Sequence, residues 1–113
     1  MTRSHVTTHI LDTGAGRPAA GVGVTLWSRQ DGDWERIGEG TTDDDGRVGS
    51  LGPEQLEPGT YRIDFATGEY FAAAGTQTFF PAVSLTFSLT DAGQHYHVPL
   101  LLSPFAYSTY RGS

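Results

Sequence analysis

The sequence predicts an all-β fold, an antiparallel β-sandwich of about eight strands with one short helix. Short runs of alternating apolar and polar residues recur along the chain, as they do in half-buried strands. The 113 residues include 15 glycines and 6 prolines, spread throughout, which indicates many turns. A single Ala-rich segment lacks this alternation. The length fits one domain, residues 1–113, that can bury a core of its own.

The first expected strand has two different faces. Val6 and Ile10 point to one side, and His5, Thr7 and His9 point to the other, because side chains alternate along a strand. A second strand is expected around residues 22–26 and a short third one at 34–38. The run Asp-Asp-Asp-Gly at 43–46 predicts a turn that leads into another short strand starting at residue 47.

The second half of the chain continues the pattern. Alternation predicts strands around residues 61–65 and 85–89, then one from 94 to 103 that Pro104 ends, and a last strand that runs toward residue 110. Residues 69–74 are Ala-rich and lie between Gly68 and Gly75. They predict a short helix with Gly75 as its C-terminal stop.

Composition excludes several classes of function. The net charge is −6 and the few arginines are scattered, which argues against nucleic acid as a partner. The chain contains no cysteine, so disulfides and thiolate metal sites are excluded. The sequence shows neither a signal-peptide pattern nor an apolar run long enough to span a bilayer, so we expect no membrane association and a cytoplasmic location.

The four histidines form two pairs, His5 with His9 and His95 with His97. Residues two apart on a strand share a face, so both pairs are expected to point away from the core. They could build a site there, or they could be ordinary surface histidines. Imidazoles also bind zinc, copper or nickel, but no carboxylate lies near either pair in the sequence to complete a metal site.

Arg47 directly follows the acidic turn. An arginine in this place can be solvated or paired with a turn carboxylate, and it can equally offer its planar guanidinium to an oxygen-rich ligand. The acidic turn itself does not have the spacing of an EF-hand calcium loop, and turn chemistry accounts for its residues.

Four blocks of sequence, in order, resemble the 5-hydroxyisourate hydrolases, the enzyme branch of the transthyretin-related family. The blocks are residues 8–19 (THILDTGAGRPA), 42–47 (TDDDGR), 79–81 (FFP) and 95–113, which contains HYHVPLLLSP and ends in YRGS. The hormone-carrier branch resembles this chain in fold but lacks the YRGS ending, and it lacks the residues at positions 9, 47 and 97. The resemblance therefore implies a transthyretin-like sandwich with enzymatic activity.

The resemblance also implies the site. His9, Arg47 and His97 correspond to the family's catalytic positions, whereas His5 and His95 are expected to be surface or supporting residues. The substrate-binding residues that it implies are His9, Arg47, Tyr110, Arg111, Gly112 and Ser113. The implied reaction opens the ring of 5-hydroxyisourate to 2-oxo-4-hydroxy-4-carboxy-5-ureidoimidazoline in urate catabolism, with no cofactor and no metal.

The family further implies a homotetramer, a dimer of dimers, with the substrate sites in the channel between the dimers. Such an assembly would enclose histidines that point away from the core, and it would cover exposed strand edges. The alternative is a non-catalytic, transthyretin-like carrier of small aromatic ligands that bind in the same channel.

Overall fold

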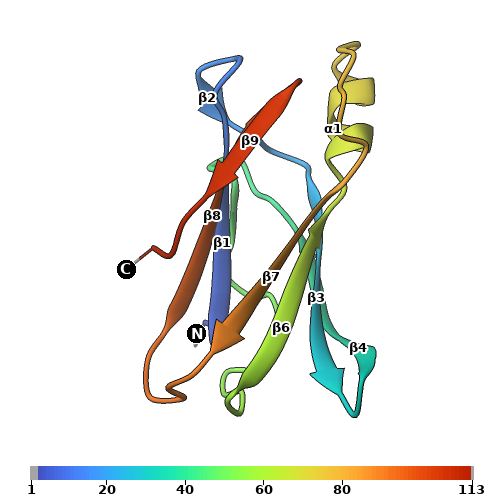
Figure 1. Cartoon of the computed structure of the whole chain (residues 1–113). Coiled ribbons are helices and arrows are strands. Elements are labelled where there is room, and N and C mark those ends of the chain that lie inside the picture. The colour runs from blue at the N-terminus through green and yellow to red at the C-terminus, as the bar shows by residue number, and fades with distance from the viewer. Residues whose placement is uncertain (1–2, 113) are drawn as a thin grey trace.

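The chain forms two packed β-sheets with one helix, and the computed structural model describes residues 3–112 (Figure 1). One sheet contains β2 (Arg17–Pro18), β1 (Val6–Asp12), β8 (Tyr96–Ser103) and β9 (Ala106–Thr109) in that order, and β5 (Arg47–Val48) also pairs with β1. The other contains β4 (Asp33–Thr41), β3 (Gly23–Gln30), β6 (Gly59–Phe65) and β7 (Val83–Leu89) in that order. The β-sandwich predicted from the sequence is therefore confirmed.

Within residues 3–112 the strands pair antiparallel with one exception. β1 and β8 run parallel over seven residue pairs, from Val6 opposite Tyr96 to Asp12 opposite Leu102. Sequence alternation does not reveal strand direction, so the sequence did not predict this parallel pair within the antiparallel sandwich. The pair brings a strand near the N-terminus and a strand near the C-terminus together at the centre of the sheet, and histidines lie in or beside both strands.

The core lies between the sheets and follows the alternation in each strand. Val6 and Ile10 of β1 and Leu100 and Leu102 of β8 are fully buried, at 0% exposure. Ile63, on β6 of the opposite sheet, is also fully buried. The alternate positions of β1 and β8 therefore point away from the second sheet.

The helix α1 (Thr67–Ala73) lies between β6 and β7 in the chain and ends as the sequence predicted. Gly75 has a φ of 69°, a left-handed conformation that favours glycine after a helix. The helix begins two residues earlier than expected and includes Gly68. A Cβ at residue 68 would lie 2.5 Å from the carbonyl oxygen of Pro81, so only glycine allows this close approach.

Two short strands, β2 and β5, complete the first sheet at its β1 side. β2 was not expected, because two residues carry no readable alternation. β5 begins at Arg47, as predicted.

In the described part of the chain no helix has the length and apolar character needed to cross a membrane.

Candidate active site

The candidate site lies on the outer face of β1, β5 and β8. His9 pairs directly with Arg47 across β1 and β5, and Thr7 pairs with His97 across β1 and β8. Directly paired residues on neighbouring strands project from the same face of a sheet. The pairing register therefore brings together three side chains from positions 9, 47 and 97, which are far apart in the sequence.

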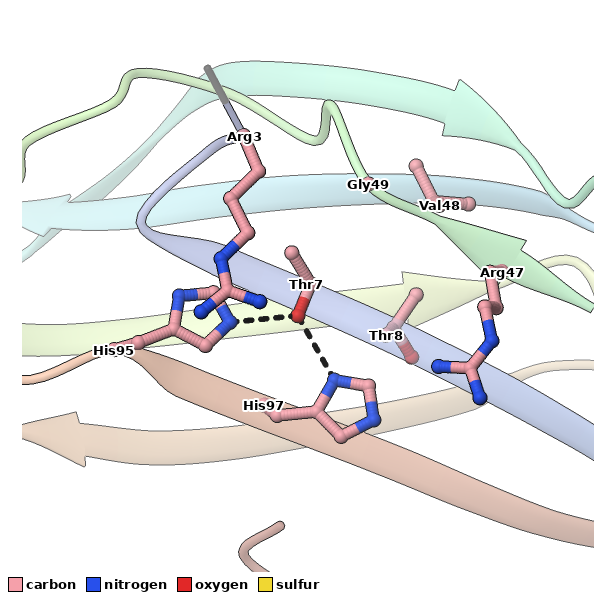
Figure 2. Close-up of a pocket in the computed structure, with 8 residues that line it drawn as sticks. All are labelled: Arg3, Thr7, Thr8, Arg47, Val48, Gly49, His95 and His97. Atoms are coloured by element: carbon pink, nitrogen blue, oxygen red, sulfur yellow. Dashed lines mark hydrogen bonds between the residues drawn. The ribbon is translucent and has the colours of Figure 1, made fainter. Parts of the chain in front are cut away.

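Arg47 and His97 line one pocket with a volume of about 280 Å³ (Figure 2). The pocket is lined by Arg3, Thr7, Thr8, Arg47, Val48, Gly49, His95 and His97. His9 lies beside it, next to Arg47 in the sheet. All three predicted catalytic residues therefore gather in one region of the surface.

The acidic turn holds both His9 and Arg47 in place. The Asp43 carboxylate accepts hydrogen bonds from the backbone N–H groups of Asp45 (2.9 Å) and Arg47 (3.0 Å). The hydrogen bond from the Arg47 N–H is the largest cause of a lowered pKa at Asp43. The Asp45 carbonyl oxygen lies 2.9 Å from Nε2 of His9. A carbonyl only accepts, so Nε2 of His9 donates and, in the neutral ring, the lone pair is left on Nδ1.

His97 is held from two sides. Its Nδ1 lies 2.8 Å from the Thr7 hydroxyl. Gly112 forms an isolated bridge with His97 and donates its N–H to the His97 carbonyl at 2.8 Å. A Cβ at residue 112 would lie 2.6 Å from Cδ2 of the imidazole, so the ring packs against bare glycine backbone. Figure 2 shows the remaining ring nitrogen, Nε2, on the side of the pocket where Arg47 lies.

The surroundings of His97 favour the neutral imidazole. Burial is the main cause of its lowered pKa, followed by the positive charge of Arg47 and then by His9 and Arg3. A hydrogen bond with the backbone of Thr7 acts in the opposite direction. A histidine that is neutral at physiological pH can take a proton, which is the property a general base requires.

His95 also belongs to the pocket, although the sequence placed it outside the catalytic set. Its Nε2 lies 2.9 Å from the Thr7 hydroxyl. Burial is the first cause of its lowered pKa, and the charge of Arg3 is the second. Thr7 and Arg3 were not singled out from the sequence either. Thr7 shares the strand face of His9, which was the one signal that could have pointed to it.

His5 does not join the other histidines, so the expectation that it shares an outward face with His9 was wrong. It lies just before β1 and is 5% exposed. Its Nδ1 accepts a hydrogen bond from the Leu56 N–H (2.8 Å), and its Nε2 donates to the Gln94 carbonyl (2.6 Å). With both ring nitrogens bonded to backbone, His5 has a structural role.

The terminal segment is divided between two places. Gly112 touches His97 at the pocket, whereas Tyr110 and Arg111 line a separate hollow of about 400 Å³ beside β7. The Arg111 guanidinium lies 4.3 Å from the centre of the Tyr96 ring and donates to the Gln94 side chain at 2.8 Å. Ser113 lies outside the described residues.

No group of three or more His, Asp or Glu side chains within residues 3–112 gathers closely enough to hold a metal ion. The pocket instead combines two histidines, a threonine hydroxyl and two arginines. Such a site can bind a flat, oxygen-rich molecule, move a proton and stabilise negative charge.

Comparison with known proteins identifies the family of this chain. The profile of the HIUase/Transthyretin family matches residues 6–112. The chain belongs to the HIUase/Transthyretin family. The 5-hydroxyisourate hydrolase of Salmonella typhimurium is 49% identical over 106 residues, which cover 93% of this chain and 78% of that protein.

Solved structures from both branches of the family share the fold. The 5-hydroxyisourate hydrolase of Klebsiella pneumoniae is similar with a TM-score of 0.84 and 38% identity, covering 96% of this chain and 98% of that one. Transthyretin from Sparus aurata gives a TM-score of 0.91 and 34% identity, with 97% of each chain covered. Fold similarity is thus high for both a hydrolase and a transthyretin, and is not higher for the hydrolase, so the side chains of the site must decide the activity.

Proposed function

We propose that this protein is a 5-hydroxyisourate hydrolase that opens the substrate ring in urate catabolism. One observation carries the proposal: the fold places His97 and Arg47 in one pocket, with His9 beside them, in a chain that is 49% identical to a 5-hydroxyisourate hydrolase. Hydrolysis of a cyclic amide benefits from a base that activates water and a donor that stabilises the developing oxyanion, and these side chains can supply both.

His97 is the proposed base. Its lowered pKa keeps the imidazole neutral, so it can take a proton from the attacking water. Arg47 is proposed to bind the substrate oxygens and to stabilise the negative charge that develops on the carbonyl. His9, fixed by the Asp45 carbonyl, is proposed to bind the ring and assist the proton transfer. The proton then passes to the ring nitrogen that leaves, and no cofactor or metal takes part.

The terminal residues 110–113 are proposed to complete substrate binding in an assembly. Gly112 packs against the His97 ring, whereas Tyr110 is 60% exposed on the single chain. β7 and β9 are edge strands of their sheets, and Phe79, Phe105 and Tyr107 also expose large aromatic surfaces. Unpaired edges and exposed aromatic groups are features of an interface.

These features support a homotetramer in which sheets pair edge to edge and two dimers enclose the sites between them. Sedimentation equilibrium tests this arrangement. A mass of four times the 12.2 kDa chain is expected, and a stable monomer would contradict it. A single domain over residues 1–113 and a cytoplasmic location remain predictions of the sequence.

The decisive test is a coupled ultraviolet assay. Urate and urate oxidase generate 5-hydroxyisourate in the cuvette, and its decay is followed with and without the protein. We expect faster decay at protein concentrations far below that of the substrate. Decay at the spontaneous rate, with the protein folded, would reject the hydrolase and favour the alternative, a transthyretin-like carrier, which ligand-binding measurements would then examine.

A further inference from the structure

The Thr7 hydroxyl connects two histidines. Its oxygen lies 2.9 Å from Nε2 of His95 and 2.8 Å from Nδ1 of His97, and Thr7 itself is buried, with 6% exposure (Figure 2). A hydroxyl carries a single proton. It can therefore donate to only one of the two rings, and it must accept from the other if both hydrogen bonds are made.

Two arrangements satisfy this condition when both rings are neutral. In the first, Nδ1 of His97 donates to Thr7 and Thr7 donates to His95, so Nε2 of His97 carries a lone pair. In the second, His95 donates to Thr7 and Thr7 donates to His97, so Nε2 of His97 carries a proton. Only the first arrangement makes Nε2 of His97 a proton acceptor on the pocket side.

The charges around the pocket favour the first arrangement. Nε2 of His97 lies on the side of the Arg47 guanidinium, which only donates hydrogen bonds and is positively charged (Figure 2). A lone pair is favourable next to this group, and an N–H dipole is not. Arg47 on β5, His9 on β1, Arg3 in the N-terminal segment and His95 before β8 are the charged or titratable groups that face His97.

We propose that Thr7 and His95 are positioning residues that hold His97 with a proton on Nδ1 and a lone pair on Nε2. The inference rests on the proposed function, because its consequence for catalysis requires His97 to be the base. When His95 becomes charged, its Nε2 carries a proton and Thr7 must turn toward His97, which removes the lone pair from Nε2. The protonation of His95 and His97 is thereby coupled, and the pH–rate profile reports the pair.

Nuclear magnetic resonance of the imidazole nitrogens tests the tautomer without any substrate. Long-range ¹H–¹⁵N spectra at neutral pH are expected to show His97 protonated at Nδ1 in the parent protein. In Thr7→Val the acceptor for Nδ1 is lost, and the Nε2-protonated form should increase. In His95→Leu the Thr7 hydroxyl is free to donate to His97, so the same increase of the Nε2-protonated form is expected. This variant tests the tautomer even if Thr7→Val does not fold.

Kinetics test the consequence. Thr7→Val and His95→Leu should each lower kcat by roughly 10-fold to 100-fold, because each removes part of the rate contribution of the general base. KM should stay within about threefold of the parent value. Thr7→Ser keeps the hydroxyl and should restore both the tautomer and most of kcat. Thr13→Val is the matched control, because it removes another threonine hydroxyl bond, from Thr13 just after β1 to the Leu102 carbonyl of β8 at 3.1 Å, away from the pocket.

An Nε2-protonated His97 in the parent would overturn the proposal, as would a tautomer and kcat that both variants leave unchanged. A parent that folds but does not open 5-hydroxyisourate would reject the proposed function alone. The tautomer and its response to Thr7→Val and His95→Leu would still support or reject the positioning role.

Discussion

The two faces of the β1–β8 pair show how one set of strands serves two purposes. On the inner face Ile10 and Leu100 are 0% exposed, and their side chains belong to the hydrophobic core. On the outer face His9 and His97 are partly exposed, and each is held by another segment, the acidic turn or Gly112. The inner face contributes to stability through the apolar area that it buries, whereas the arrangement of the side chains on the outer face depends on individual hydrogen bonds. Substitutions on the two faces should therefore separate activity from stability.

The largest expected effect is a loss of activity on the outer face. Arg47→Ala removes the proposed stabiliser of the developing charge, and kcat/KM should fall about 10²–10³-fold, as when one oxyanion donor is lost. The free energy of unfolding should change little. Arg36→Ala is the matched control, since Arg36 is an exposed arginine on the other sheet that forms only a surface ion pair with Glu39 at 3.8 Å among the described salt bridges. Equal activity of both variants in the ultraviolet assay would contradict the assignment of Arg47.

A change on the inner face should have the opposite signature. Leu100→Ala leaves a cavity in the fully buried core and should lower the free energy of unfolding by about 2–5 kcal/mol. The folded fraction should retain kcat/KM within about threefold, because Leu100 has no contact with substrate in the proposed mechanism. Chemical denaturation followed by tryptophan fluorescence measures the stability. A large loss of activity in fully folded protein would show that the two faces are not independent.

The acidic turn joins the two faces, so a substitution there should affect both properties. Gly46 has a φ of 76°, and a Cβ would lie 2.3 Å from the Ile10 carbonyl oxygen. Gly46→Ala should lower the free energy of unfolding by about 1–3 kcal/mol through backbone strain. It should also lower kcat/KM, because the turn positions His9 and Arg47. Gly16→Ala is the control, since Gly16 has a similar φ of 72° but open space around its Cβ. Similar effects of both substitutions on activity would reject a special role of the acidic turn.

Sequence reasoning recovered the inner face and only part of the outer one. Alternation placed Val6 and Ile10 in the core, because burial on one side of a strand leaves a period of two. The gathering of His9, Arg47 and His97 followed from the family resemblance and not from spacing. Strand register is a long-range property, so the sequence did not show that Thr7 lies opposite His97 or that β1 and β8 run parallel.

The positions of His5 and His95 show the same limit of sequence periodicity. Spacing placed both pairs of histidines on outward faces; His95 lies on that face and lines the pocket, but His5 is buried and fixed by two backbone hydrogen bonds. Their roles depend on the segments packed against them, around Leu56 for His5 and around Thr7 for His95. Periodicity within one strand contains no information about these neighbours.

The smallest expected effect is a shift in the pH dependence. Burial, followed by the charge of Arg47, lowers the pKa of His97, so the neutral base should persist below the ordinary value of 6.5. The acid limb of the kcat/KM profile should therefore have its midpoint below pH 6.5 in the parent. In Arg47→Gln, which removes a positive charge that opposes protonation, the midpoint should move upward. Titration of the His97 ring resonances gives the same comparison without turnover, and Arg36→Gln serves as the control. A parent midpoint at or above the ordinary value, or one that Arg47→Gln leaves in place, would show that Arg47 acts on the substrate alone and does not keep His97 neutral.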